Sequence, residues 1–240
     1  MRCFAALVPP ASFLAALEMA LLPYMTGLQG WRLVRPEGIH VTLAFMADAG
    51  PVMIDAAVAA LQGMAVPAMA VGHERAVQAA VPGVGNWAAP VSLRFGPPTL
   101  FPSLARPRVL ALEPIQGADE LAGLWNGFNG LFHREALARK LPPPNPEWRS
   151  GARFRPHLSL ARPVNRPGQR PVVRPGQEPA VCHANATASG SSVALYEVFI
   201  FDELVLYESI RGYDGPRYIP LAQAFLVQKP LAHASLTGDA

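Results

Sequence analysis

The sequence HVTL at residues 40–43 recurs as HLSL at residues 157–160, and an alanine follows each copy. Both copies lie in short apolar runs that are typical of β-strands. Because side chains on a strand alternate between its two faces, the histidine and the hydroxyl residue two positions later point the same way. The repeat therefore predicts two strands that each present an imidazole and a hydroxyl on one face.

The elements predicted around the two copies follow a similar order in each half. Apolar alternation predicts strands over 2–8, 31–34, 39–45, 91–95, 108–112 and 154–162. Apolar periodicity predicts helices from a Ser12 cap to Pro23, over 52–64 and over 117–139. A hairpin is predicted over 194–207 and 217–227, around a turn at 212–215. Residues 65–108 give few clear elements, and the Pro- and Gly-rich residues 163–190 predict an exposed excursion. This order predicts an α+β fold in one domain over 1–228, followed by a tail over 229–240.

Composition limits the classes to which the chain can belong. Hydrophobic residues make up 51% and charged residues 15% of its 240 residues, which favours a compact globule over a disordered chain. The formal charge of +3 is compatible with a polyanionic ligand. The sequence contains no block of Lys and Arg residues of the kind that forms a nucleic-acid-binding tail. Because Cys3 and Cys182 suggest neither a disulfide framework nor a thiolate metal site, we expect a cytoplasmic protein. No apolar run approaches the roughly 20 residues of a membrane span, so no membrane partner is expected.

The paired tetrads indicate acid–base chemistry at a single site. A lone histidine in an apolar strand is usually a core residue, but two matching copies favour a shared function. Two imidazoles and two hydroxyl donors around one tetrahedral anion suit a phosphodiesterase that needs no metal. The other histidines have no metal-ligand spacing, and the absence of a Gly-rich phosphate loop disfavours nucleoside triphosphates as substrates. We therefore expect neither a metal nor a cofactor. The remaining histidines are His73, His133, His183 and His233.

Longer segments around the tetrads resemble the two-histidine phosphoesterase superfamily, and within it the bacterial and archaeal RNA 2',3'-cyclic phosphodiesterases, also called 2'-5' RNA ligases. The resemblance covers most of the chain, in the family's order. It rests on the opening strand at 2–8, on VRPEGIHVTLAF at 34–45, on RPHLSLAR at 155–162, and on DELVLYES at 202–209 with YIPL at 218–221.

This resemblance implies a bilobal, pseudo-symmetric pair of antiparallel sheets flanked by helices, with the active cleft between the lobes. It implies hydrolysis of terminal 2',3'-cyclic phosphates to 2'-phosphates, with His40 as the general acid and His157 as the general base. Thr42 and Ser159 are expected to donate hydrogen bonds to phosphate oxygens, although serine replaces the family's more usual threonine. Arg162 matches the position of a phosphate-contacting arginine in the family.

Phe45 is a candidate for stacking on the terminal base, and core packing is its alternative role. Arg35 and Arg155 are candidates for adding positive charge at the cleft mouth. We expect a monomer that acts on RNA ends or cyclic nucleotides.

Three functions remain open from the sequence. The first is an RNA-end hydrolase, with 2'-5' ligation as its reverse reaction. The second is a phosphodiesterase for small cyclic nucleotides or an ADP-ribose cyclic phosphate. The third is an RNA-end-binding module without turnover, which the retention of both histidines and both hydroxyls disfavours.

Overall fold

A computed structural model describes residues 1–21, 31–65, 89–103, 107–144, 154–164, 197–212 and 215–226. The helices in these ranges are α1 (Ala11–Leu21), α2 (Pro51–Met64), α3 (Ala118–Ala138) and the short 3-10 helix η2 (Pro36–Gly38). The strands are β1 (Cys3–Val8), β2 (Trp31–Leu33), β3 (Val41–Met46), β4 (Val91–Phe95), β5 (Thr99–Phe101), β6 (Val109–Leu112), β7 (Pro114–Gln116), β8 (Leu158–Pro163), β9 (Phe199–Phe201), β10 (Glu203–Gly212) and β11 (Gly215–Phe225). None of the described helices is long and apolar enough to span a bilayer.

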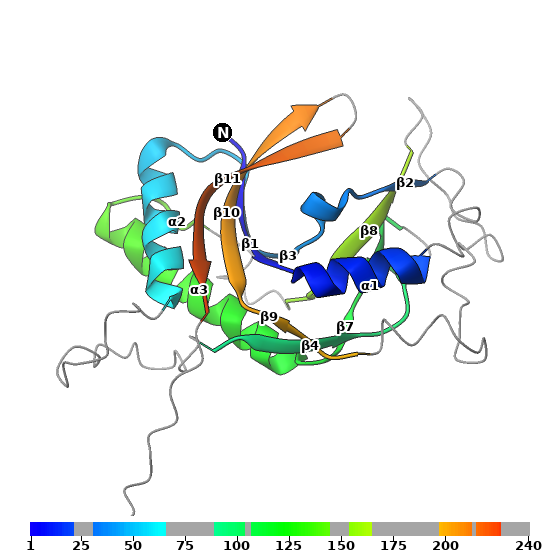
Figure 1. Ribbon diagram of the computed structural model, residues 1–240. Coiled ribbons are helices and arrows are strands. Elements are labelled where there is room, and N and C mark those ends of the chain that lie inside the picture. The colour runs from blue at the N-terminus through cyan, green and yellow to red at the C-terminus, as the bar shows by residue number, and fades with distance from the viewer. Residues whose placement is uncertain are drawn as a thin grey trace, which may run out of the picture.

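The strands form two antiparallel sheets, as Figure 1 shows. The larger sheet has eight strands in the order β11-β10-β1-β3-β8-β6-β5, with β2 also paired to β8. The smaller sheet has the order β7-β4-β9. At Asp202 the chain passes from β9 in the small sheet to β10 in the large one, so the strand predicted over 194–207 is two strands.

Helices cover the buried sides of both sheets. α2 and α3 pack against each other and against β3, β10 and β11 of the large sheet, on the left of Figure 1. α1 places Phe13 against three rings of the small sheet, with centroid distances of 5.1 to 5.6 Å. The rings belong to Phe95, Phe199 and Phe201. Burial of such rings is the main favourable term for holding the layers together.

The two tetrad strands meet at the centre of the large sheet. Val41 of β3 pairs with Leu158 of β8, and both side chains are fully buried. This pairing makes one continuous sheet from the two halves, where the sequence predicted a pair of similar sheets. The α+β class and the antiparallel sheets are confirmed.

Each tetrad strand contains a β-bulge at its fourth tetrad residue. β1 pairs Ala5 with Ala44 and Ala6 with Thr42, so Leu43 is the extra residue of β3. β6 and β8 repeat this arrangement, and there the extra residue is Leu160. A bulge shifts the alternation of side chains by one position. The fifth residue after each histidine therefore joins the face of the histidine.

The backbone carbonyls of both bulged residues find donors outside the strand ladder. Asn129 of α3 donates from Nδ2 to the Leu43 carbonyl at 3.0 Å and to the Trp125 carbonyl at 2.8 Å. The Leu160 carbonyl accepts from the backbone N–H of Val34 at 2.8 Å. Among the described residues, Asn129 is the one polar side chain in the buried class. Satisfying a buried carbonyl is worth enough to explain an amide in this core.

Most sequence predictions for regular elements are confirmed, with differences at their ends. The helix predicted to begin at a Ser12 cap begins at Ala11, because the carbonyl of Pro10 accepts the first helical hydrogen bonds. β5 and β7 were not predicted, since each has only three residues and lies among prolines or glycines. The tail at 229–240 and most of the excursion at 163–190 lie outside the described residues.

Replacing Asn129 with alanine is expected to lower the free energy of unfolding by about 1–3 kcal/mol, because the buried Leu43 carbonyl loses its side-chain donor. Urea unfolding measures this change. Gln62→Ala also removes a side-chain amide, at an exposed position of α2, and is expected to cost less than about 0.5 kcal/mol. Equal stabilities of the two variants would contradict the role given to Asn129.

Candidate active site

His40 and His157 each lie one residue before their strand, β3 and β8. The Val41–Leu158 pairing places the two tetrads side by side and antiparallel. Continued by one residue in each direction, this register sets His40 opposite Ser159 and His157 opposite Thr42. Each imidazole therefore faces the hydroxyl residue of the other tetrad, and all four side chains share one face of the sheet.

Both imidazoles are held in the same tautomer by the same local hydrogen bond. His40 Nδ1 donates to the Gly38 carbonyl at 2.8 Å, and His157 Nδ1 donates to the Arg155 carbonyl at 3.0 Å. A carbonyl only accepts, so Nδ1 carries the hydrogen in each ring. Nε2 is consequently the nitrogen that can accept or donate a proton in a reaction.

Aromatic rings fix the orientation of each imidazole. His40 stacks on Phe4 of β1 with centroids 4.6 Å apart, and Tyr218 of β11 meets it edge-on at 5.5 Å. His157 stacks on Phe101 of β5 at 4.0 Å. Rings that pack this closely restrict rotation about χ2 and exclude water from one face of the imidazole. No site role was predicted for these three aromatic residues, although Tyr218 lies in a segment that carried the resemblance.

Both imidazoles are neutral at pH 7 in the free protein. Burial lowers the pKa of His40 from 6.5 to about 4; its hydrogen bond to Gly38 opposes this shift, and the charges of Arg162 and His157 add to it. Burial also lowers the pKa of His157 below 6.5.

One carboxylate distinguishes the two histidines. Glu113 forms an ion pair with Arg155 at 3.2 Å, and the Arg155 guanidinium lies 4.5 Å from the centroid of Phe101. The negative charge of Glu113 raises the pKa of His157, against the larger effect of burial. Among the described residues, no carboxylate contributes to the pKa shift of His40. The sequence predicted positive charge at Arg155, but its ion pair with Glu113 reduces the field it can exert.

A groove of about 420 Å³ opens beside the first tetrad. Its lining includes four of the predicted site residues: His40, Thr42, Phe45 and Arg162. His157 and Ser159 are not among its lining residues. The β-bulges explain why Phe45 and Arg162, five residues after the two histidines, reach the same face as the tetrads.

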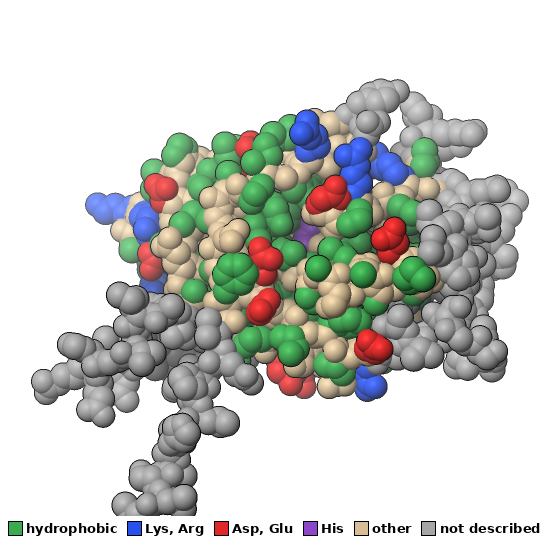
Figure 2. Space-filling model, viewed as in Figure 1, with side chains coloured by type: hydrophobic (Ala, Val, Ile, Leu, Met, Phe, Trp, Pro, Cys, Tyr) green, Lys and Arg blue, Asp and Glu red, His purple; other side chains and the backbone are tan. Residues whose placement is uncertain are grey.

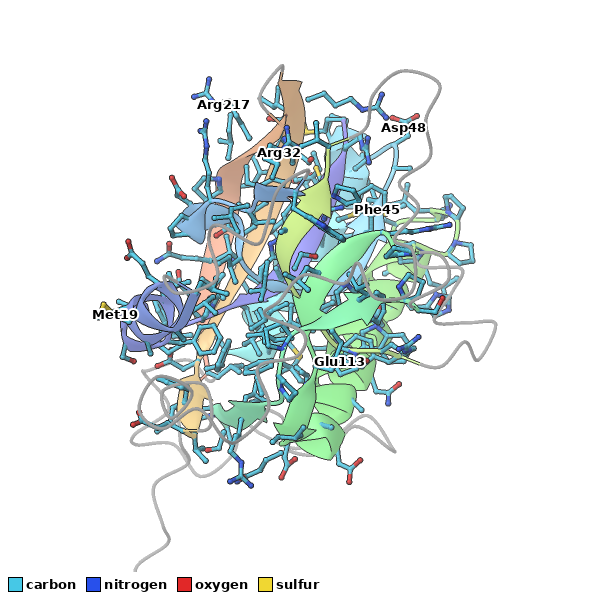
Figure 3. All side chains as sticks on the ribbon, turned by 90° about the vertical axis from the view of Figure 1, so that its right-hand side faces the viewer. Met19, Arg32, Phe45, Asp48, Glu113 and Arg217 are labelled. Atoms are coloured by element: carbon cyan, nitrogen blue, oxygen red, sulfur yellow. The ribbon has the colours of Figure 1, made fainter. Side chains whose placement is uncertain are left out.

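Phe45 is a surface residue, so the core-packing alternative is wrong. Its side chain is 43% exposed, and the guanidinium of Arg2 lies 5.2 Å from its ring centroid. Figure 3 looks onto this side of the molecule and labels Phe45 between Arg32 and Glu113. An exposed ring beside an arginine is suited to stacking on a nucleobase.

Among the described residues, no group of three or more His, Cys, Asp or Glu side chains is placed to hold a metal ion. The histidines His73, His183 and His233 lie outside the described ranges. His133 lies on α3 and does not line the groove beside the first tetrad.

Comparison with solved structures identifies the fold. The chain matches TT0787 of Thermus thermophilus with a TM-score of 0.60 at 20% identity, over 94% of this chain and 98% of that one. It matches E. coli LigT complexed with 3'-AMP with a TM-score of 0.56 at 19% identity, over 95% and 98%. The complex of LigT with phosphate matches with a TM-score of 0.54 at 18% identity, over 95% and 98%. The chain therefore has the LigT fold, as the sequence resemblance implied.

Neither protein-family models nor curated protein sequences give a match to this chain. The likeness is thus carried by the three-dimensional structure and by the short segments around the tetrads.

Titration of the imidazoles by NMR tests the electrostatics of the site. Both His40 and His157 are expected to gain their second proton below pH 6.5, with His40 the lower of the two at about pH 4. The sign follows from burial, which penalises the charged imidazolium. Above these values, the ¹⁵N shifts should report a protonated Nδ1 and a bare Nε2. A pKa at or above 6.5 for His40 would contradict the arrangement.

Proposed function

We propose that this protein is a metal-independent RNA 2',3'-cyclic phosphodiesterase that hydrolyses terminal 2',3'-cyclic phosphates to 2'-phosphates. The observation that carries the proposal is the Val41–Leu158 pairing, which sets two imidazoles and two hydroxyls on one face. The LigT fold supports it, since E. coli LigT has been solved with phosphate and with 3'-AMP. A 2'-5' ligation would be the same reaction in reverse.

The proposed reaction is an in-line displacement at phosphorus. Nε2 of one histidine removes a proton from water as the water oxygen bonds to phosphorus. The bond from phosphorus to the ribose 3' oxygen breaks, and Nε2 of the other histidine protonates that oxygen. The family resemblance assigns His40 as the acid and His157 as the base.

Three neighbouring groups would stabilise the charge that develops on the phosphate. Thr42 and Ser159 hydroxyls would donate hydrogen bonds to the non-bridging oxygens, and Arg162 would add a fixed positive charge. Their positions on the face of the tetrads support these roles. Phe45 would stack on the terminal base of the substrate.

Burial lowers the pKa of His40 to about 4, whereas at His157 the carboxylate of Glu113 opposes the effect of burial, so His157 holds a proton more readily than His40 in the free protein. His40 would therefore take up its proton when the anionic cyclic phosphate binds beside it. A negative charge at hydrogen-bonding distance raises an imidazole pKa and makes this order feasible.

Removing either imidazole is expected to abolish turnover. His40→Ala and His157→Ala should each lower kcat for a 2',3'-cyclic phosphate by at least about 100-fold, the usual contribution of a general acid or base. The assay is run in excess chelator, with folding checked by circular dichroism. His133→Ala, on α3, is the matched control and should keep wild-type activity. Full activity in either tetrad variant would refute the proposal.

A sulfur leaving group distinguishes the acid from the base. A thiolate leaves without needing a proton, so replacing the 3' oxygen of the cyclic phosphate by sulfur should restore activity to the variant that lacks the acid. Recovery is expected for His40→Ala and not for His157→Ala, measured as the ratio of kcat for the two substrates. Recovery confined to His157→Ala would reverse the assigned roles.

A further inference from the structure

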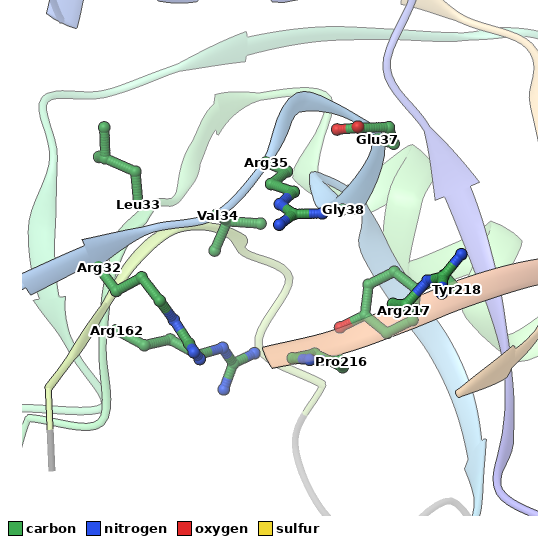
Figure 4. A pocket seen from close by; sticks show the side chains of 10 residues that line it. All are labelled: Arg32, Leu33, Val34, Arg35, Glu37, Gly38, Arg162, Pro216, Arg217 and Tyr218. Atoms are coloured by element: carbon green, nitrogen blue, oxygen red, sulfur yellow. The ribbon is translucent and has the colours of Figure 1, made fainter. Parts of the chain in front are cut away.

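A second groove, of about 460 Å³, adjoins the one beside the first tetrad. The two grooves share Arg162, Pro216 and Tyr218 as lining residues, so they form a continuous surface. We call the second one the arginine groove. Its charged lining residues are Arg32, Arg35, Arg162, Arg217 and Glu37, four cations and one anion. Figure 4 shows these side chains around the groove.

Two of the arginines lie directly opposite each other on neighbouring strands. Arg32 of β2 is the cross-strand partner of Arg162 of β8. Figure 4 shows both side chains extending the same way and ending near Pro216. Like charges at directly opposed positions of an antiparallel pair are destabilising. An anion between or beside the two guanidiniums would remove that cost.

The guanidinium of Arg32 lies close to the start of β11. A side chain at Gly215, where φ is 114°, would come within 3.0 to 3.1 Å of three guanidinium atoms of Arg32. Glycine at this position therefore lets the hairpin of β10 and β11 approach Arg32 closely. Arg32 thus lies at the junction of the two grooves.

The arginines of this groove have no ion-pair partner within the described part of the chain. The salt bridges found there involve the N-terminus, Arg134, Arg139 and Arg155. Glu37 lines the groove, but it is not within ion-pair distance of any described arginine. Figure 2 shows Lys and Arg side chains gathered on the upper right of the molecule. Among the described residues, the lining of the groove therefore carries an excess of positive charge, which suits an anionic ligand.

We propose that the arginine groove binds the phosphodiester backbone of single-stranded RNA, next to the terminal cyclic phosphate in the tetrad site. This inference rests on the proposed function. The groove is continuous with that site. Its several guanidiniums can bind the oxygens of successive phosphates, whereas an isolated carboxylate would engage only one or two of them. Aliphatic and charged side chains dominate its walls, which favours reading of the backbone over reading of the bases. The enzyme would accordingly prefer an oligonucleotide to a mononucleotide.

The test compares a trinucleotide that ends in a 2',3'-cyclic phosphate with cytidine 2',3'-cyclic phosphate. The readout is the ratio of kcat/KM for the two substrates, measured between low and moderate salt. We expect the wild-type protein to favour the trinucleotide by about tenfold at low salt. In the double variant Arg35→Gln/Arg217→Gln the ratio should approach one. For the trinucleotide, the slope of log kcat/KM against log salt concentration should be less steep in the double variant by about 1.4, since each of the two lost phosphate contacts contributes roughly 0.7 on a single strand.

Arg134→Gln is the matched control, because it removes one exposed arginine charge from α3, outside the groove. Both Arg35 and Arg217 are exposed, so their replacement leaves the core intact. A wild-type ratio near one, or a ratio that Arg134→Gln lowers as much as the double variant does, would overturn the inference while the proposed function stands.

If neither substrate is turned over, the proposed function fails, and the groove is tested by binding alone. Fluorescence anisotropy of a labelled single-stranded RNA trinucleotide with a 2'-phosphate end then replaces the kinetic assay. Weaker binding to the double variant, and unchanged binding to Arg134→Gln, would support the groove. Equal binding to the wild type and the double variant would overturn it, as would equal competition by polyglutamate.

Discussion

The pairing of Val41 with Leu158 is the constraint on which the candidate site depends. Both side chains are buried, so the pair is anchored from the core side of the sheet. Because side chains alternate along each strand, fixing these two residues inward fixes their neighbours outward. A slip by one residue in either strand would turn the imidazole of that strand into the core. Burial of the core thereby determines which groups face a ligand.

The paired bulges also determine which side chains face the candidate site. Each places one extra leucine in a tetrad strand and brings the fifth residue after the histidine onto the site face. In one half that residue is Phe45, and in the other it is Arg162. The same backbone device thus presents an aromatic ring on one side and a guanidinium on the other. The carbonyls that the bulges displace are satisfied by Asn129 and by the backbone of Val34.

The electrostatic differences between the halves come from residues outside the tetrads. Glu113 and Arg155 lie on the side of His157, whereas the arginine groove lies on the side of His40. The two halves therefore share a backbone plan but differ in charge. Such a difference gives the two imidazoles unequal proton affinities, which suits one of them to act as an acid and the other as a base.

The sequence predicted the parts of this structure that depend on local patterns. The three helices are apolar segments bounded by turn-forming residues, and the final hairpin has a clear turn. The tetrads share their histidine and final leucine, with a hydroxyl residue between them in each copy. Regular alternation, however, sends the fifth residue after a histidine to the opposite face. Arg162 entered the site only through the family resemblance, because a bulge leaves no reliable mark in one sequence. The aromatic partners of the histidines, such as Phe101, could not be predicted either, since these long-range contacts depend on how the strands assemble into a sheet.

A crystal structure with orthovanadate and a ribonucleoside would show whether both histidines act on one phosphorus, because vanadate joined to the ribose 2' and 3' oxygens imitates the geometry of in-line attack. We expect one vanadium atom between the two imidazoles, with Nε2 of His40 and Nε2 of His157 each within hydrogen-bonding distance of a different apical oxygen. Vanadate bound to only one of the two rings, or bound away from both, would contradict it.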